Sequence, residues 1–238
     1  MQSLFKIFEQ SFWQVLGKVV TTFSTFVILG IVARNYGKEG IGVFTLALTY
    51  LGIFYLLSDF GFNAHVLKNL KSQSSNLKTE WQQLLGTRIL WSVVLVILAV
   101  GLLPFWPFAT FVFSQAVFFG SLAIIGSGIF TTCNLIFQSK LRYDLSVLAV
   151  SVGTLLSLLV FIAVSFYKYP VPILLFVHLL GWVLIAFFAL LLARKLSPNI
   201  FPVFDLNYMV TLLKDTWPIA ATLALNVVYF RADSFMIA

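Results

Sequence analysis

The sequence contains few charged residues and one cysteine. Only 10% of its 238 residues are Asp, Glu, Lys or Arg, and the mean hydropathy is +1.01. Soluble domains carry about 25% charged residues, so the composition excludes an ordinary soluble domain. Cys133 stands alone in an apolar stretch, which excludes an internal disulfide and a cysteine-cluster metal site. We expect it to act as a small packing residue.

The sequence also lacks the motifs of common enzyme and cofactor sites. It has neither G-x-S-x-G nor H-E-x-x-H, and the stretch RNYGKEGIGVF lacks the glycine and lysine spacing of a phosphate-binding loop. The two histidines, Cys133 and the few carboxylates have no metal-ligand spacing. The net charge is +7, but no basic cluster is interleaved with aromatic residues. We therefore expect no enzyme activity, cofactor, metal site or nucleic-acid partner.

Long apolar runs dominate the sequence. A helix needs about 20 apolar residues to cross the hydrocarbon core of a bilayer. The run Phe108–Phe137 is longer than this, so we expect its helix to start late or to tilt. A seventh run begins near Trp217 and is cut off at Ala238. We predict an all-α integral membrane fold of six transmembrane helices plus a truncated seventh. The six complete runs are roughly Phe12–Ala33, Ile41–Ala64, Leu84–Phe105, Phe108–Phe137, Leu145–Tyr167 and Val171–Ala193.

The distribution of Lys and Arg predicts a cytoplasmic N-terminus, because cytoplasmic loops carry an excess of these residues. The amphipathic segment 1–14 is expected to be an interfacial lead-in to the first span. We divide the chain into a six-span lobe (1–193), a cytoplasmic linker (194–214) and the truncated seventh span (215–238). The outer segments then hold Arg34, Lys38 and Lys168, and the inner ones hold Lys6, Lys68, Lys71, Lys78, Lys140, Arg142, Arg194, Lys195 and Lys214.

One face of the first run carries a polar stripe. Lys18 lies about 9 Å into this run from Phe12, at 1.5 Å per residue. A charge at the centre of a span costs about 2.5–3.5 kcal/mol, so the lysine either snorkels to the interface or lines a water-filled cavity. The stripe that continues inward favours a cavity. Its candidate lining residues are Gln14, Lys18, Thr21, Thr22 and Thr25.

Other runs contain isolated ionisable side chains. Asp59 lies near the inner end of the second run, where we expect a structural role, with Lys68 or backbone N–H groups as its partner. His178 is alone in the sixth run and is either hydrogen-bonded structure or a proton relay. Asp59, His178 and Asp233 are the candidates for ion coupling or structure.

The seventh run adds two candidate cavity residues. Asn226 and Asp233 lie near one helical face, whereas Arg231 is two residues from Asp233 and points almost the opposite way. Arg231 and Asn226 are the additional candidates for the cavity lining.

The stretch ARNYGKEGIGVFTLALTYLGIFYLLSDFGFNAHVLK resembles the start of the oligosaccharide flippase (polysaccharide biosynthesis) family. This family is part of the multidrug/oligosaccharidyl-lipid/polysaccharide exporter superfamily. Its members have an R-x-L-G-P-E-x-F-G-like turn between the first two spans, and then a D-x-G signature that ends in a basic residue. FQSKLRYD resembles the family's basic loop between spans four and five, and WPIAATLALNVVYFRADSFMIA looks like its seventh span. The matching motif residues are Arg34, Gly37, Glu39 and Gly42, then Asp59, Gly61 and Lys68, with Lys38 where proline is usual.

The resemblance implies two six-helix lobes with a substrate cavity between them and alternating access. The chain would supply the first lobe, so its expected partners are membrane lipids and a missing C-terminal lobe, from the same parent chain or a second polypeptide. We expect residues 1–238 alone not to transport. The implied function is a flippase or exporter of polyprenyl-diphosphate-linked oligosaccharide, such as an O-antigen unit, in the inner or plasma membrane. Lys18, and secondarily Arg231, would attract the diphosphate.

Two other functions stay open on the sequence. A cation-coupled multidrug antiporter of the same superfamily needs cavity carboxylates, but the first run has a lysine and no acid. The second alternative is a non-transporting membrane scaffold or a natural half-protein that pairs with a second polypeptide, and it is suggested by the abrupt end of the sequence.

Overall fold

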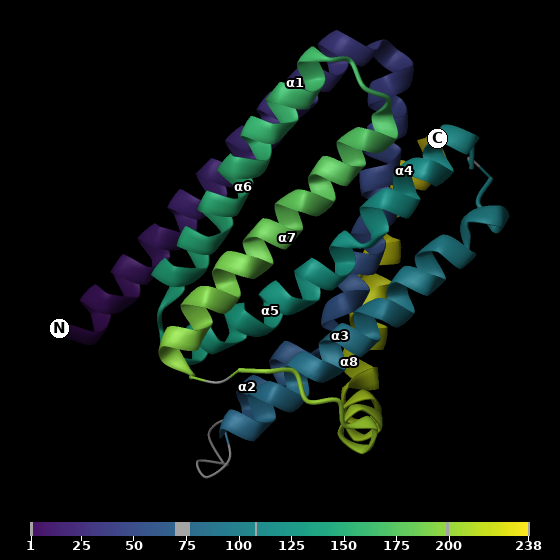
Figure 1. The fold of residues 1–238 in the computed structure, drawn as a ribbon. Coiled ribbons are helices and arrows are strands. Elements are labelled where there is room, and N and C mark those ends of the chain that lie inside the picture. The colour runs from purple at the N-terminus through teal and green to yellow at the C-terminus, as the bar shows by residue number, and fades with distance from the viewer. Residues whose placement is uncertain (1, 70–76, 108, 199, 238) are drawn as a thin grey trace.

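The computed structural model is a bundle of long α-helices (Figure 1). It describes residues 2–69, 77–107, 109–198 and 200–237, but not the side chains of residues 2–7, 68–69, 77–78, 223–224 and 226–237. No strand occurs in this part of the chain, and the predicted all-α membrane class is confirmed. Five helical segments within it are long and apolar enough to cross a membrane: Phe8–Leu67, Thr79–Phe105, Phe111–Ser139, Tyr143–Phe166 and Val171–Leu196.

Helix α1 (Gln2–Asp59) contains both the first and the second predicted run. Its 58 residues correspond to about 87 Å of helix, far more than the roughly 30 Å of a hydrocarbon core. The helix bends at Gly37, where φ is 65° and ψ is −163°, a conformation open mainly to glycine. Figure 1 shows a first arm (residues 2–36) that rises to this bend and a second arm (38–59) that descends from it.

Two predicted boundaries in this region are wrong. The second run was expected to continue to Ala64, but the chain breaks at Phe60 and Gly61, with φ of 46° and 80°, before α2 (Phe62–Asn69). Helix α3 (Leu77–Gly101) begins before the predicted Leu84, and a 3₁₀ turn (Leu103–Phe105) follows it. Hydropathy marks where a helix leaves the apolar region, whereas good helix formers such as Lys, Glu and Gln extend α3 beyond that point.

The fourth run starts late, as expected, but it is also divided. Thr110 caps helix α4 (Phe111–Ser121), because its side chain accepts a hydrogen bond from Phe113 N at 3.2 Å. A turn at Leu122 separates α4 from α5 (Ala123–Ser139). Helices α6 (Tyr143–Phe166) and α7 (Val171–Leu196) begin within two residues of the predicted runs.

Helix α8 (Leu206–Ile237) begins well before the predicted Trp217. Asp205 caps it, since its Oδ1 accepts hydrogen bonds from the backbone N–H groups of Asn207 and Tyr208 at 3.0 and 3.1 Å. The short linker 197–205 is tied to α3, because Val203 N donates to Gln82 O at 3.0 Å. Helices α7 and α8 thus extend into the predicted linker segment 194–214 from both sides.

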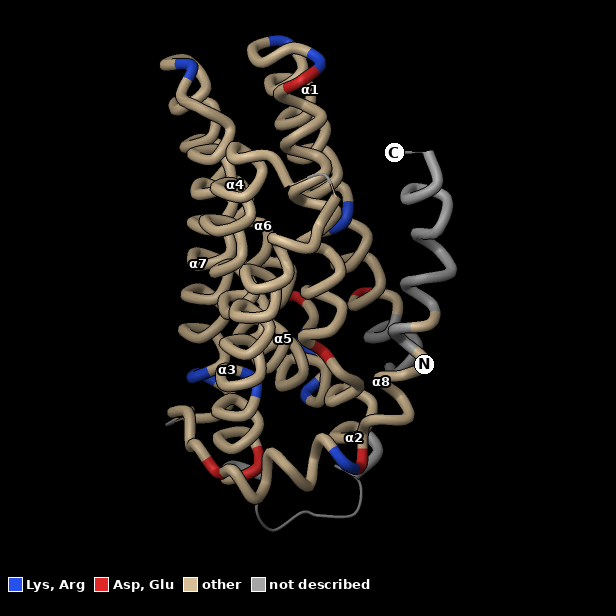
Figure 2. Tube along the Cα trace, turned by 90° about the vertical axis from the view of Figure 1, so that its right-hand side faces the viewer, with Lys and Arg blue, Asp and Glu red and all other residues tan. Residues whose placement is uncertain are grey.

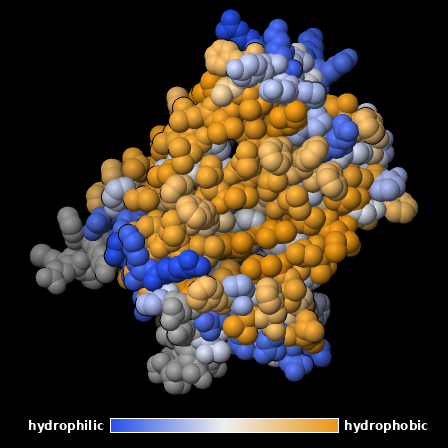
Figure 3. Space-filling view, viewed as in Figure 1, coloured by the Kyte–Doolittle hydropathy of each residue, from blue (hydrophilic) through white to orange (hydrophobic). Residues whose placement is uncertain are grey.

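The bundle has two polar ends and an apolar middle. We call the end at the α1 bend the Gly37 end, and the end with α2, the α5–α6 turn and the 197–205 linker the linker end. Lys, Arg, Asp and Glu gather mainly toward these two ends (Figure 2). Between them, the face of the molecule shown in Figure 3 is largely apolar. Exposed side chains such as Ile97, Leu159 and Phe187 suit contact with lipid.

Two buried clusters hold the helices together. The first lies toward the Gly37 end and includes Phe44, Leu51 and Phe113, with Tyr50 donating a hydrogen bond to Ala99 O at 2.7 Å. The second lies toward the linker end and joins α2, α3, α5 and α7 to the start of α8 through Leu212. These clusters position the first arm of α1 against α6, beside the polar hollows described next.

Candidate functional site

Two adjoining hollows follow the polar face of the first arm of α1. The Lys18 hollow, of about 270 Å³, lies between this arm, α5 and α6. It brings together three of the predicted cavity residues, Gln14, Lys18 and Thr21, with amide and hydroxyl side chains of the neighbouring helices. Its lining residues are Gln14, Gly17, Lys18, Thr21, Asn134, Gln138, Tyr143, Ser146, Val147 and Val150.

The Trp182 hollow, of about 320 Å³, continues along the same arm and reaches α7. Thr21 and Val150 line both hollows, so the two are contiguous. Thr25, another predicted cavity residue, lies here, but Thr22 is exposed and lines neither hollow. The lining residues are Thr21, Ser24, Thr25, Ile28, Phe130, Val150, Thr154, Ser157, His178, Gly181, Trp182 and Ile185.

The charge of the described lining is positive. Lys18 is exposed to the hollow, and no Asp or Glu is among the described residues that line either hollow. The charge of Arg142 at the nearby α5–α6 turn is compensated by Asp144, because Arg142 Nε and Nη2 each donate a hydrogen bond to the Asp144 carboxylate at 2.9 Å. This hydrogen-bonded carboxylate raises the pKa of Arg142. Lys18 therefore supplies the net charge of the hollows.

The hydroxyl groups of Thr21 and Thr25 already donate their protons to backbone carbonyls of α1. Thr21 Oγ1 donates to Gly17 O at 3.1 Å, and Thr25 Oγ1 donates to Thr21 O at 2.9 Å. Each hydroxyl oxygen can still accept a hydrogen bond. In this arrangement they suit ligand O–H groups better than phosphate oxygens, which accept but do not donate.

Two hydrogen bonds fix the walls of the Lys18 hollow. Tyr143 N donates to Gln10 Oε1 at 2.7 Å and ties the start of α1 to the start of α6. Ser146 Oγ donates to Asn134 Oδ1 at 2.7 Å and joins α6 to α5. The hollow therefore has a defined shape without a ligand.

His178 is part of the wall of the Trp182 hollow. Its Nε2 lies 3.0 Å from Tyr55 Oη on the second arm of α1, within hydrogen-bond distance. The structure also brings no group of three His, Cys, Asp or Glu together as a metal site within its described residues. The Tyr55 contact suits a hydrogen-bonded structural histidine, and the proton-relay interpretation stays a prediction.

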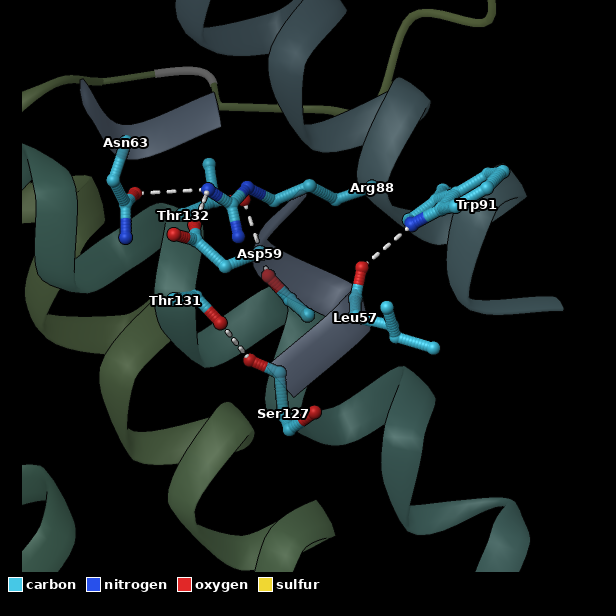
Figure 4. A network of polar contacts seen from close by, with 9 residues as sticks. Leu57, Asp59, Asn63, Arg88, Trp91, Ser127, Thr131 and Thr132 are labelled. Carbon is cyan, nitrogen blue, oxygen red and sulfur yellow. Dashed lines mark hydrogen bonds and ion pairs between the residues drawn. The ribbon is translucent and has the colours of Figure 1, made fainter. Parts of the chain in front are cut away.

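Asp59 has a partner that the sequence analysis missed. Arg88 on α3 is fully buried, and its Nη2 donates to Asp59 Oδ1 at 3.0 Å and to Asn63 Oδ1 at 2.8 Å (Figure 4). The ring of Phe62 lies 5.4 Å from its guanidinium carbon. The sequence analysis did not name this partner, and the Lys68 side chain that it expected beside Asp59 lies outside the described residues. The sequence did contain a signal for this pair, because Arg88 is a charged residue four positions inside the apolar run Leu84–Phe105.

Four predicted residues cannot be placed in the site. The side chains of Lys68, Asn226, Arg231 and Asp233 lie outside the described residues, although their backbone belongs to α2 or α8. Their roles stay predictions.

The sequence model of one protein family, described as "Polysaccharide biosynthesis protein", matches residues 7–238. The chain belongs to this family. No curated protein and no solved structure matches the chain. Its family membership and its long apolar helices together indicate a multi-pass membrane protein.

Two of the three glycines in the motifs that resemble the family, Gly37 and Gly61, lie at breaks in the helices. Gly37 forms the bend of α1, and Gly61, with φ of 80°, forms the break before α2. A Cβ on Gly61 would lie 2.7 Å from Ile219 Cγ2, so α8 crosses this break closely. Arg34, Glu39 and Gly42 are exposed at the Gly37 end. The described motif residues thus relate to the path of the backbone, and none of them lines either hollow.

Proposed function

We propose that the protein is a flippase that moves a polyprenyl-diphosphate-linked oligosaccharide across the inner or plasma membrane by alternating access. The single observation that carries this proposal is the exposed Lys18 in a hollow whose described lining has no carboxylate. The family match over residues 7–238 supports the connection with polysaccharide biosynthesis.

The chemistry of the hollow favours an anionic ligand. Two opposite unit charges 4 Å apart attract each other by about 4 kcal/mol at an effective dielectric constant of about 20, and by about 1 kcal/mol in bulk water. A diphosphate beside Lys18 would gain from this, and the amide groups of Gln14 and Gln138 can donate further hydrogen bonds. A cationic drug would be repelled by the same lysine. The lipid tail of the substrate would stay in the bilayer, next to the open side of the two hollows.

The proposed topology places the N-terminus and the linker end in the cytoplasm. The bend at Gly37 and the α6–α7 turn then face the opposite side of the membrane. In this orientation Lys18 lies toward the cytoplasmic end of the two hollows, where the substrate is loaded. The described residues form one wall of the transport cavity, and a second lobe would supply the other wall.

Translocation of lipid-linked oligosaccharide in proteoliposomes made with the full-length protein tests this function. We expect Lys18→Ala to reduce the rate at least tenfold, and Lys18→Arg to retain most of it, because the site needs a cation. Lys38→Ala is the matched control, since Lys38 is exposed at the Gly37 end and lines neither hollow.

A wild-type rate in Lys18→Ala would refute the role of Lys18. Resistance to cationic drugs in a pump-deficient host, together with no lipid translocation by the wild type, would instead favour a multidrug antiporter.

A further inference from the structure

The Trp182 hollow differs in chemistry from the Lys18 hollow that adjoins it. It contains no charged side chain among its described lining residues, but it has five hydroxyl groups and an indole ring. A neutral hollow with hydroxyls around an aromatic surface does not suit a diphosphate. It suits a ligand with polar O–H groups at its edge and apolar C–H groups on its face.

Packing fixes the position of the indole ring. The Trp182 ring centroid lies 5.5 Å from that of Tyr55 and 6.2 Å from that of Phe130. The Trp182 backbone rests against Gly126, where an added Cβ would lie 3.0 Å from Trp182 O. The ring is nevertheless only half-buried, so part of it remains available to the hollow. Such a prearranged aromatic surface loses little entropy when a ligand covers it.

The hydroxyl groups around this ring divide into two kinds. Thr21, Ser24 and Thr25 donate to their own helix, so their oxygens are acceptors toward a ligand. Thr154 and Ser157, three residues apart on α6, are described side chains without a hydrogen bond to a helix carbonyl, so they can still donate. Sugar hydroxyls both donate and accept. The hollow therefore offers both kinds of partner that a sugar ring needs.

The geometry points to a sugar-binding subsite in the Trp182 hollow, which takes a sugar ring of the lipid-linked oligosaccharide while the diphosphate lies at Lys18. This inference rests on the proposed function. Lys18 and Thr25 are seven residues apart on α1, or about 10 Å along the helix, so one extended ligand can reach both hollows. At about 320 Å³, the Trp182 hollow is at the lower end of the roughly 300–1,000 Å³ of small-molecule sites. It suits one part of an oligosaccharide.

Two binding measurements on the full-length protein in nanodiscs test the subsite. One ligand is polyprenyl diphosphate without sugar, and the other is the lipid-linked oligosaccharide extracted from membranes of the host, with both followed by native mass spectrometry. We expect the sugar-bearing lipid to bind wild-type protein about tenfold more tightly. We expect Trp182→Ala to abolish this sugar advantage while the affinity for polyprenyl diphosphate stays unchanged. Phe187→Ala, an exposed aromatic residue on the same helix, is the matched control and should keep the advantage.

A second variant keeps the indole ring and removes the two donors. Thr154→Val combined with Ser157→Ala should reduce the sugar advantage by about fivefold, and this variant decides the question if Trp182→Ala fails to fold. Equal affinities of the wild type for the two lipids, or a full sugar advantage in a folded Trp182→Ala or double variant, would overturn the subsite. Lys18→Gln separates the two proposals, because it should weaken both ligands equally and leave their ratio intact. If it weakens neither, the diphosphate site is wrong, and the ratio still tests the sugar subsite.

Discussion

Lys18 and Arg88 are both basic residues inside apolar runs, but the structure gives them different surroundings. Lys18 is exposed to a hollow whose described lining contains no carboxylate. Arg88 is fully buried and bound to Asp59 and Asn63. A buried cation needs its partners inside the fold, whereas an exposed one with no partner can serve a ligand. Burial and partners, and not position in an apolar run, thus distinguish the ion-paired Arg88 from Lys18, the proposed ligand-binding residue.

The largest expected effect is that of Arg88→Ala on stability. The substitution leaves the carboxylate of Asp59 without its ion-pair partner and removes a buried side chain, which typically costs about 3–5 kcal/mol. Thermal unfolding of the purified protein in detergent, followed by tryptophan fluorescence, measures the loss. Arg142→Ala is the control, because its ion pair with Asp144 is partly exposed and such pairs contribute about 0–1 kcal/mol. Equal unfolding temperatures for the two variants would contradict the structural role of Arg88.

The backbone beside Asp59 should be the next most sensitive position. Gly61→Ala places a side chain at φ of 80° and 2.7 Å from Ile219 Cγ2, so we expect a loss of about 1–3 kcal/mol. The matched control is Gly42→Ala, since a Cβ there meets no atom within 4 Å and alanine favours the helix. Thermal unfolding of the pair shows whether the α1–α2 break is needed for the packing of α8. A Gly61→Ala protein as stable as Gly42→Ala would mean that this crossing can move without cost.

The smallest expected effect is that of Lys18→Ala on stability. Exposed side chains without a partner usually change the free energy of unfolding by less than about 0.5 kcal/mol. We therefore expect Lys18→Ala to unfold like the wild type, although it loses binding of polyprenyl diphosphate. Unfolding and binding are measured on the same preparation at low and high salt, because screening should weaken only lysine-dependent binding. A destabilisation as large as that of Arg88→Ala would remove the distinction between the two residues.

Much of the fold could be predicted from hydropathy, because a helix that crosses lipid must be apolar over a known length. Helices α6 and α7 illustrate this, since their starts lie within two residues of the predicted runs. The turn at Leu122 could not be predicted, because the run around it is apolar on both sides and only packing distinguishes α4 from α5. The early start of α8 depends on Asp205, whose capping role becomes clear only from its hydrogen bonds.

The candidate site was predictable in part for a similar reason. The polar stripe of Gln14, Lys18, Thr21 and Thr25 could be read from helical periodicity, and the structure places these four beside the hollows. Trp182 was not predicted, because an aromatic residue in an apolar run gives no sign of what it faces. The membrane chemistry of the helices and the polar face of the first arm were thus determined by the sequence, since both follow from residues close together along the chain. The Arg88–Asp59 pair and the joining of the two hollows were decided by tertiary structure, because each depends on side chains that only the packing of separate helices brings together.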